Sequence, residues 1–403
     1  MELDEALSAR LAAFYRDLHR NPELSHQEVR TAGRIAGELA ALDLTATSGV
    51  GGTGVVAVIE NGDGPTVLLR ADMDALPVAE ETGLPYASTS TGRDPAGAEV
   101  PVMHACGHDM HVTCLLGAAT WLSGNRDAWS GTVVAVFQPA EEVAAGARAM
   151  IADGLFDRFP RPSVVLGQHV TSLPAGTVGY VPGTAMAAAD QVRVRLFGRG
   201  GHGSQPEATI DPVVMAASVV LRLQTIVARE VGPSESAVVT VGYLRAGTKE
   251  NIIPAEAELG ISVRTFSEDV RRRVLSAVER IVLAEAAASG AEKDPEITVT
   301  LHAPLLVNDV AATTRTARAL AGELGEEKVL RLPPVSASED VGIFGAAAGV
   351  PTVYWFWGGV AVDGLARAAD SPSNHSPRFA PVIEPTLGTG VRALVTAALT
   401  WLD

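Results

Sequence analysis

The amino-acid sequence predicts an α/β protein: a mostly parallel sheet with helices, interrupted by a smaller α+β two-layer sandwich. Continuous apolar strands alternate with helical segments early in the chain, and this alternation returns after residue 303. Between them, the strands alternate polar and apolar residues instead. The 403 residues also exceed the length at which a single hydrophobic core usually stops growing. We therefore expect two domains, formed by residues 1–186 with 303–403 and by residues 187–302.

The first domain opens with helices predicted over 4–20 and 28–41. The glycine-rich stretch 49–54 has the pattern G-x-G-x-x-G, but it leads into a strand, whereas a dinucleotide-binding turn opens a helix. This excludes a nucleotide site there. Four continuous apolar strands are then predicted, separated by helical sequence, at 66–70, 131–137, 163–167 and 351–356. Strands of this kind are typical of a parallel sheet buried on both faces.

Polar side chains follow three of these strands where each one ends. Asp72 and Asp74 follow the first, Glu141 and Glu142 the second, and His169 the third. In parallel sheets, functional groups collect at the carboxyl ends of the strands. We therefore expect these five side chains to lie close together.

The inserted domain is predicted from the order of its elements, which is β-α-β-β-α-β. This order is typical of a small ferredoxin-like sandwich. The predicted elements are a strand over 189–197, a helix over 211–229, strands over 236–245 and 256–264, a helix over 267–289 and a strand over 296–302.

The composition of the chain limits the classes of molecule that it can bind. A net charge of −16 argues against nucleic acid and anionic membranes, because both require a basic face. We find no basic and apolar leader and no apolar run near the ~18 residues that a membrane span needs. Two cysteines make no disulfide framework. We expect a cytoplasmic protein.

The segment 103–111 holds three histidines, a cysteine and an aspartate. Cys106 and His108 are two positions apart, so on an extended or turned backbone both can reach one ion. Asp109 is a plausible N-cap of the helix that follows. Thiolate, imidazole and carboxylate ligands together suit zinc or a similar divalent ion. The alternative is a polar loop with a buried cysteine, but the density of ligands favours metal.

Other candidate residues are less clear by themselves. Glu141 and Glu142 could divide the work, one ligating metal and the other acting as general base, or form a solvated acidic turn. His169 could be a ligand or a core residue. His375 lies in a loop, where a histidine by itself is little evidence of a metal site.

In the inserted domain, His202 lies among glycines and could donate to an oxyanion or merely occupy a flexible turn. Ser204 is followed by Pro206 where a nucleophile elbow needs glycine, which disfavours a serine hydrolase. Arg264 closes a strand and could bind a carboxylate, although spacing alone favours an ordinary surface arginine. Asn251 lies in the motif Asn-Ile-Ile-Pro of the same domain.

Taken together, several motifs resemble the amidohydrolase branch of the M20 metallopeptidase family. The resemblance runs in order from residue 19 to the end of the chain. The motifs are Met103-His104-Ala105-Cys106-Gly107-His108-Asp109, Phe137-Gln138-Pro139-Ala140-Glu141-Glu142, Gly200-Gly201-His202-Gly203-Ser204, Asn251-Ile252-Ile253-Pro254 and Ser338-Glu339-Asp340.

The resemblance implies a metallohydrolase domain with a lid and dimerisation domain inserted into it, and therefore a homodimer or higher oligomer. It implies two divalent ions, zinc first with manganese or cobalt as alternatives, held by Cys106, His108, Glu142, His169 and His375. Glu141 would be the general base and His202 a transition-state donor, often supplied across a dimer interface. Asn251 and Arg264 would contact the substrate carboxylate, and the supporting residues would be Asp72, Asp74 and Asp109.

The implied activity is hydrolysis of N-acyl-L-amino acids to a carboxylic acid and a free amino acid. The alternatives are a dipeptidase of the same family and a metal-binding protein without turnover. The chain departs from the family pattern at Val143-Ala144-Ala145, where glycines are usual, and at Val341, where phenylalanine is usual. The second departure leaves the acyl group open.

Overall fold

The computed structural model describes residues 3–361 and 371–402. The chain forms two compact units. The first comprises Met1–Ala185, Val307–Pro333 and Asp340–Asp403, and the second comprises Met186–Leu306 and Pro334–Glu339. The segment Pro334–Glu339 thus belongs to the second unit, although the sequence analysis assigned it to the first domain.

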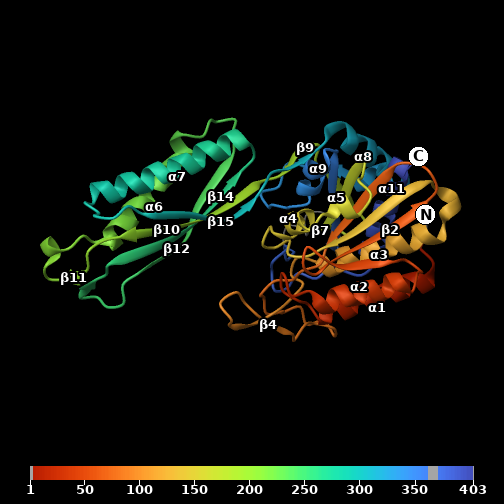
Figure 1. Ribbon diagram of the computed structural model, residues 1–403, viewed down its shortest axis with the longest axis horizontal. Helices are drawn as coiled ribbons and strands as arrows, with labels where there is room; N and C mark the ends of the chain where they lie inside the picture. Colours follow the sequence, from red (N-terminus) through yellow and green to blue (C-terminus); the bar gives the residue numbers. More distant parts are fainter. Residues whose placement is uncertain (1–2, 362–370, 403) are drawn as a thin grey trace. The chain divides into compact units, whose positions relative to one another are not determined.

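The first unit is built on an eight-stranded sheet with the order β1-β2-β6-β3-β7-β18-β8-β17 (Figure 1). Its four central strands are parallel and the first pairings at its edge are antiparallel, so the predicted mostly parallel sheet is confirmed. The strands are β1 (Ala46–Val50), β2 (Gly54–Asn61), β3 (Thr66–Asp72), β6 (Gly131–Gln138), β7 (Val164–Pro174), β8 (Val178–Tyr180), β17 (Val329–Arg331) and β18 (Thr352–Val360).

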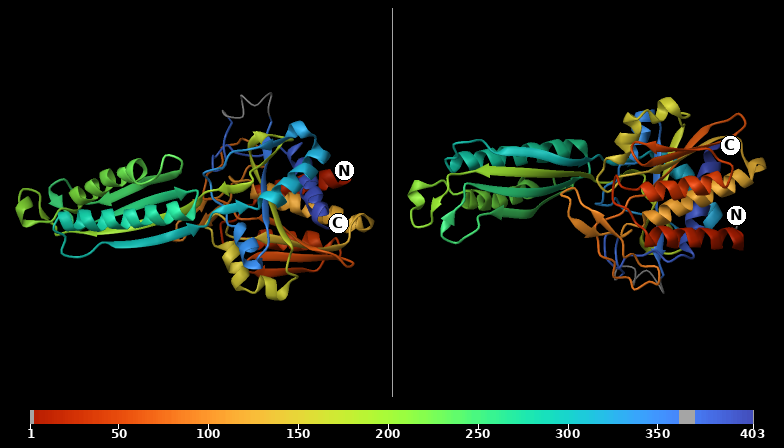
Figure 2. Two further views of the ribbon diagram at one scale, coloured as in Figure 1. Left: turned by 90° about the horizontal axis from the view of Figure 1, so that it is seen from above. Right: turned by 60° about the horizontal axis from the view of Figure 1, so that its bottom comes forward.

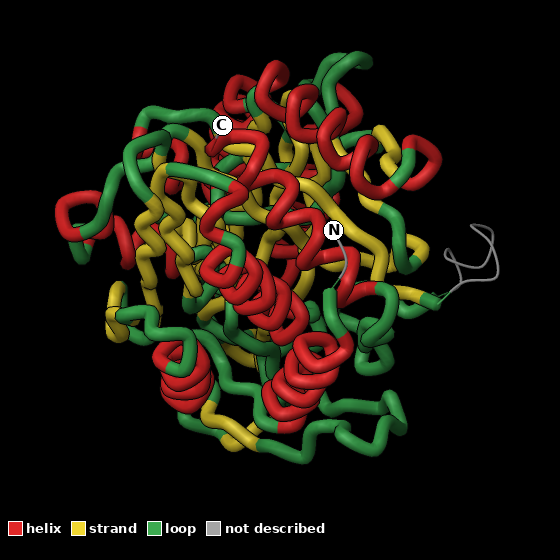
Figure 3. Tube along the Cα trace, turned by 90° about the vertical axis from the view of Figure 1, so that its right-hand side faces the viewer, coloured by secondary structure: helices red, strands yellow, loops and turns green. Residues whose placement is uncertain are grey.

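Helices cover this sheet (Figure 3), and α1 and α2 both pack against α3 (Figure 2). The helices of the unit include α1 (Glu5–Arg20), α2 (Val29–Ala40), α3 (His108–Gly124), α4 (Gly146–Ala152), α5 (Leu155–Arg158), α8 (Val310–Leu324), α9 (Gly342–Ala348) and α11 (Thr386–Leu402). Short strands β4 (Thr91–Arg93) and β5 (Glu99–Pro101) form a hairpin outside the sheet. The two helices predicted at the start of the chain are confirmed as α1 and α2.

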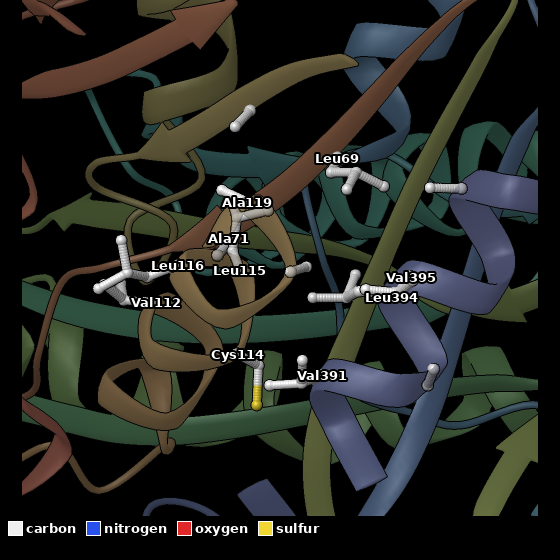
Figure 4. Close-up of a cluster of buried hydrophobic side chains, with 14 of the residues drawn as sticks. Leu69, Ala71, Val112, Cys114, Leu115, Leu116, Ala119, Val391, Leu394 and Val395 are labelled. Atoms are coloured by element: carbon white, nitrogen blue, oxygen red, sulfur yellow. The ribbon is translucent and has the colours of Figure 1, made fainter. Parts of the chain in front are cut away.

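The core of this unit positions the start of α3. Figure 4 shows apolar side chains of α3, β3 and α11 around Cys114, which is fully buried and is a core residue, as predicted. Gly117 lets α3 approach α11 closely, because a Cβ there would lie 2.6 Å from the Val391 side chain. Tight packing on the sheet therefore holds the first turn of α3 in one place.

Two local predictions were wrong. The N-cap of α3 is Gly107, with φ +84°, and Asp109 lies in the first turn instead. Only glycine adopts that left-handed conformation at little cost. His169 does not end its strand, because β7 continues to Pro174 through parallel pairing with β18.

The second unit has an antiparallel sheet with the order β12-β14-β10-β15, covered by two helices on one face (Figure 1). It has its own buried apolar core, and its β-α-β-β-α-β order confirms the predicted sandwich. The elements are β10 (Ala188–Phe197), α6 (Pro212–Arg229), β12 (Ala237–Ala246), β14 (Glu256–Thr265), α7 (Glu268–Ala288) and β15 (Glu296–Ala303). The short strands β11 (Gly201–His202) and β13 (Ile252–Ile253) pair beside them.

Helix α6 is both long and apolar. By length and composition it could cross a membrane, with 33% of it buried inside the structure. The helix was predicted over 211–229, but its apolar run is interrupted by Arg222 and Gln224 and was not expected to span a membrane. Its buried side chains, such as Met215 and Leu223, instead belong to the core of the second unit.

Candidate metal centre

The five predicted ligands lie together in the first unit, at the carboxyl edge of the central strands. Four of them come from the segments that the strand pattern and the cysteine–histidine cluster had indicated, and His375 is the fifth. Cys106 and His108 flank the N-cap of α3, Glu142 lies in the turn after β6, His169 lies in β7, and His375 lies in the loop before α11.

Distances between their ligand atoms are those of a metal site. Cys106 Sγ lies 3.5 Å from His169 Nε2. Glu142 lies 3.8 Å from His108 Nε2 through Oε1 and 3.4 Å from His375 Nε2 through Oε2. In the groups Cys106–His108–His169 and Cys106–Glu142–His375, the ligand atoms are within 4.8 Å of one another. Two groups that share a residue are compatible with two neighbouring ions.

The donor atoms fit divalent cations. His108 Nε2 and Glu142 Oε1 are buried and have no hydrogen-bond partner within residues 3–361 and 371–402. A buried polar atom without a partner is costly, and a cation between these two would satisfy both. Thiolate, imidazole and carboxylate are the ligands that zinc takes in proteins.

The charges of the site also favour a cation. Burial alone would lower the pKa of His108, but the surrounding carboxylates, Asp72 first, raise it to about 10. Burial and the nearby Glu142 raise the pKa of the Cys106 thiol well above its usual range. Burial lowers the pKa of His169 to about 4, which keeps this imidazole neutral.

Asp74 orients two of the ligands at once. His108 Nδ1 lies 2.9 Å from the Asp74 carbonyl oxygen and 3.3 Å from its Oδ1. The backbone amide of Glu142 donates to Asp74 Oδ2 at 3.0 Å, and Ser25 Oγ donates to the same oxygen at 2.6 Å. Such contacts fix the tautomer and direction of a ligating histidine.

Asp72 is held between an arginine and a histidine. Arg70 Nη1 donates to its Oδ2 at 2.7 Å, and His111 Nδ1 contacts its Oδ1. Burial would raise the pKa of Asp72, but Arg70 and the neighbouring histidines lower it well below its usual value. His111 Nε2 in turn accepts from the backbone amide of Val170, beside His169. No role was expected for Arg70, although a charge inside an apolar strand is a signal in the sequence.

Asp109 binds His19, which is not one of the predicted ligands. Its Oδ2 lies 2.6 Å from His19 Nδ1, and His19 Nε2 lies 3.1 Å from Glu80 Oε1. Burial would lower the pKa of His19, but Asp109 and Glu80 raise it to about 9. Asp109 therefore anchors the first turn of α3 to the end of α1.

His375 is placed by its neighbour Asn374, which the sequence analysis did not single out. Asn374 Nδ2 donates to the carbonyl oxygens of Cys106 and Val170, both at 3.0 Å. His375 has φ +70°, and its backbone amide donates to the Ala105 carbonyl oxygen at 2.8 Å. The loop is thus bound to two ligand segments that lie far from it in the sequence.

The other three candidate residues belong to the second unit. Ser204 donates to His202 Nδ1 from its backbone amide at 3.1 Å, with its Oγ at 2.7 Å from the same nitrogen. The Gly203 amide donates to the Asn251 carbonyl oxygen at 2.9 Å, so His202 and Asn251 are neighbours. Arg264 is half-buried in β14, and its Nη1 donates to Ser338 Oγ at 2.9 Å.

Comparisons with known proteins agree on one family. The chain matches Peptidase family M20/M25/M40 over residues 68–400, a range that contains all five predicted ligands. It is 39% identical to the N-acetylcysteine deacetylase of Bacillus subtilis (strain 168) over 298 residues, which cover 72% of this chain and 74% of that protein.

Two further proteins extend this similarity. The chain is 39% identical over 332 residues to the hippurate hydrolase of Campylobacter jejuni, covering 81% of this chain and 82% of that one. It also resembles the crystal structure of the Bacillus subtilis YXEP protein, a dinuclear metal-binding peptidase of the M20 family. That match has a TM-score of 0.76 and 30% identity, and covers 99% of both chains.

Proposed function

The chain belongs to peptidase family M20/M25/M40 and is a metal-dependent amidohydrolase, and from this premise we propose that it hydrolyses N-acyl-L-amino acids. The products are a carboxylic acid and a free amino acid. The observation that carries this proposal is the adjacent pair Glu141 and Glu142, whose carboxylates lie within 4.8 Å of the His108 ligand atom. A site that only stored metal would need no second carboxylate beside its ligand.

In this reaction, five residues of the chain would hold the metal ions and one would transfer the proton. Cys106, His108, Glu142, His169 and His375 hold the ions, zinc being the best match to these donors. When bound, two divalent cations supply polarisation of the amide carbonyl and lower the pKa of the attacking water. Glu141 accepts the proton of that water and later returns it to the nitrogen of the departing amino acid.

His202 is proposed as the donor to the developing oxyanion. Its Nδ1 accepts from the Ser204 amide, which can only donate, so the proton of the neutral ring is on Nε2. His202 is exposed, which leaves Nε2–H available to a substrate. Arg264 and Asn251 are proposed to bind the substrate carboxylate, for which a planar guanidinium is well suited.

We also propose that two copies associate through the second unit. β12 is an edge strand, and α6 beside it exposes apolar side chains, with Val214 61% and Leu221 73% exposed. Edge strands and exposed apolar faces are costly in a monomer, and a two-fold axis would cover both at once. A second copy of the chain is therefore the proposed occupant of this face.

The names of two similar proteins support the substrate class, because hippurate and N-acetylcysteine are both N-acyl amino acids. A peptidase is the second candidate, since the similar YXEP protein is described as one. The two differ in what surrounds the α-nitrogen, which is acylated by a simple acid in one substrate and by an amino acid with a free amine in the other.

A release assay distinguishes them. The purified protein is loaded with zinc, manganese or cobalt and given N-acetyl, N-benzoyl and long-chain N-acyl amino acids, with dipeptides in parallel. We expect free amino acid from the acylated substrates, abolished by a chelator. Cleavage of dipeptides alone would make the protein a peptidase, and no release from any substrate would contradict the proposal.

A further inference from the structure

The turn that carries Glu141 and Glu142 is tightly folded. Ala140 has φ +51°, a left-handed conformation that residues other than glycine rarely adopt. The amides of Ala145 and Gly146 both donate to the Ala140 carbonyl oxygen at 3.1 Å. A Cβ at Gly146 would lie 1.5 Å from the Pro139 oxygen, so the chain turns back directly on itself. A turn of this kind persists only when its surroundings hold it.

Carboxylates from distant segments hold this turn by its backbone amides. Asp74 Oδ2 accepts from the Glu142 amide at 3.0 Å, and Asp340 Oδ2 accepts from the Ala147 amide at 3.1 Å. Glu28, immediately before α2, accepts from the Ala140 amide through Oε1 at 2.8 Å. The Glu28 contact is therefore made at the strained residue itself, directly before the proposed base.

Glu28 is buried without serving its own helix. It is fully buried, and Thr53 Oγ1 donates to its Oε2 at 2.6 Å, so both carboxylate oxygens are engaged. Its side chain makes no capping bond to α2 in the part of the chain that the structure describes. The first turn of α2 is bound by Glu23, whose carboxylate accepts from the amides of Arg30 and Thr31 at 3.0 and 2.7 Å.

Burying a carboxylate costs free energy unless hydrogen bonds or opposite charges compensate for the lost water. Burial accordingly raises the pKa of Glu28. Glu23 already binds the helix terminus, so Glu28 is left to bind Thr53 and Ala140, and its bond to Ala140 is the one that reaches the turn of the proposed base. This contact links the N-terminal segment to the turn after β6, 112 residues later.

We propose that Glu28 is a positioning residue for the reaction: it fixes the left-handed backbone at Ala140 and thereby the direction of the Glu141 carboxylate. The inference rests on the proposed function, in which Glu141 transfers the proton. A base displaced by about 1 Å can lose about 10²-fold in rate, so a single hydrogen bond to its turn can matter for kcat.

The test compares two substitutions of Glu28 with one of Glu23. Glu28→Met keeps the volume but removes the acceptor, and we expect kcat to fall about tenfold or more, with KM and the content of two metal ions unchanged. Glu28→Gln keeps an oxygen for the Ala140 amide and should retain kcat within about threefold. Glu23→Met removes the two hydrogen bonds that the first turn of α2 makes to a carboxylate. It should lower the melting temperature without changing kcat.

Wild-type kcat in Glu28→Met, or an equal loss of kcat in Glu23→Met, would overturn the proposal. If Glu28→Met fails to fold, Thr53→Val replaces it, because it releases Oε2 of Glu28 and should lower kcat a few-fold at constant KM. An unchanged kcat in Thr53→Val would then overturn the proposal.

The proposed role of Glu28 and the proposed function can be rejected independently. If the wild-type protein releases no amino acid from any substrate, the function is rejected. If it is active and Glu28→Met is equally active, only the role of Glu28 is rejected.

Discussion

His19 Nδ1 and Asp109 Oδ2 lie 2.6 Å apart with both side chains fully buried, although the residues are 90 positions apart in the sequence. This pair joins the last turn of α1 to the first turn of α3, which begins with the ligand His108. The pair is therefore part of the framework of the metal centre without contacting the metal.

This contact predicts a stability that depends on pH. The folded pKa of His19 is raised from 6.5 to about 9, so its stabilisation is complete below pH 6.5 and is lost as the pH rises through 9. The shift corresponds to about 3 kcal/mol in the free energy of unfolding. Urea unfolding between pH 6 and pH 10 would measure this decline. The decline should be smaller in His19→Gln and unchanged in His26→Gln, which changes an exposed histidine; equal slopes in both variants would contradict the assignment.

Replacing the proposed base should separate chemistry from metal binding. Glu141→Gln is expected to lower kcat by about 10²–10⁴-fold with both ions retained, because the amide cannot accept the proton. Glu142→Gln should instead lower the metal content, which elemental analysis of the dialysed protein measures. Substantial turnover by Glu141→Gln would remove this residue from the role of base.

Asn374 is expected to support metal affinity. Asn374→Ala removes the donor to the Cys106 and Val170 carbonyl oxygens and loosens the loop that carries His375. Supporting contacts of this kind are worth about 10–100-fold in metal affinity. Competition with a chelator gives the affinity, and Ser376→Ala in the same loop serves as the control. Equal affinities in both variants would show that Asn374 has no such role.

His202 is expected to affect turnover alone. His202→Ala should lower kcat by about 10²–10³-fold, the usual contribution of one donor to an oxyanion. Ser204→Ala keeps the backbone donor to His202 Nδ1 and should have a much smaller effect. Steady-state kinetics with the best acylated substrate decides this, and an unchanged kcat in His202→Ala would exclude the donor role.

The apolar face of α6 predicts a dimer. Leu221→Glu places a charge on the proposed interface and should convert the dimer to a monomer in analytical ultracentrifugation. Leu283→Glu changes a residue of α7 that is 38% exposed, and should leave the dimer intact. A wild-type protein that is monomeric, or that sediments with lipid vesicles instead, would contradict self-association through this face.

Several features could be predicted from the sequence because their signals are local. The apolar runs of β3 and β6 identified buried parallel strands, and residues that follow such strands must share one edge of the sheet. Asp74 and Glu142 were expected to be neighbours for this reason, and the backbone amide of Glu142 donates to the carboxylate of Asp74. The spacing of Cys106 and His108 likewise indicated a shared ion because it depends on only three residues.

Asp72, Asp74 and Asp109 were expected as supporting residues, and only the tertiary structure decided which further side chains support that site. Glu28 reaches Ala140, His19 reaches Asp109 and Asn374 reaches Cys106 across 112, 90 and 268 positions of sequence. In the sequence each of these residues looks like an ordinary polar residue near a helix or a loop. Their roles follow from burial, because a polar group removed from water must find a partner wherever the packed chain places one. The sequence by itself therefore determined the strands and the chemistry of the ligands, and packing determined the hydrogen bonds that hold those ligands in place.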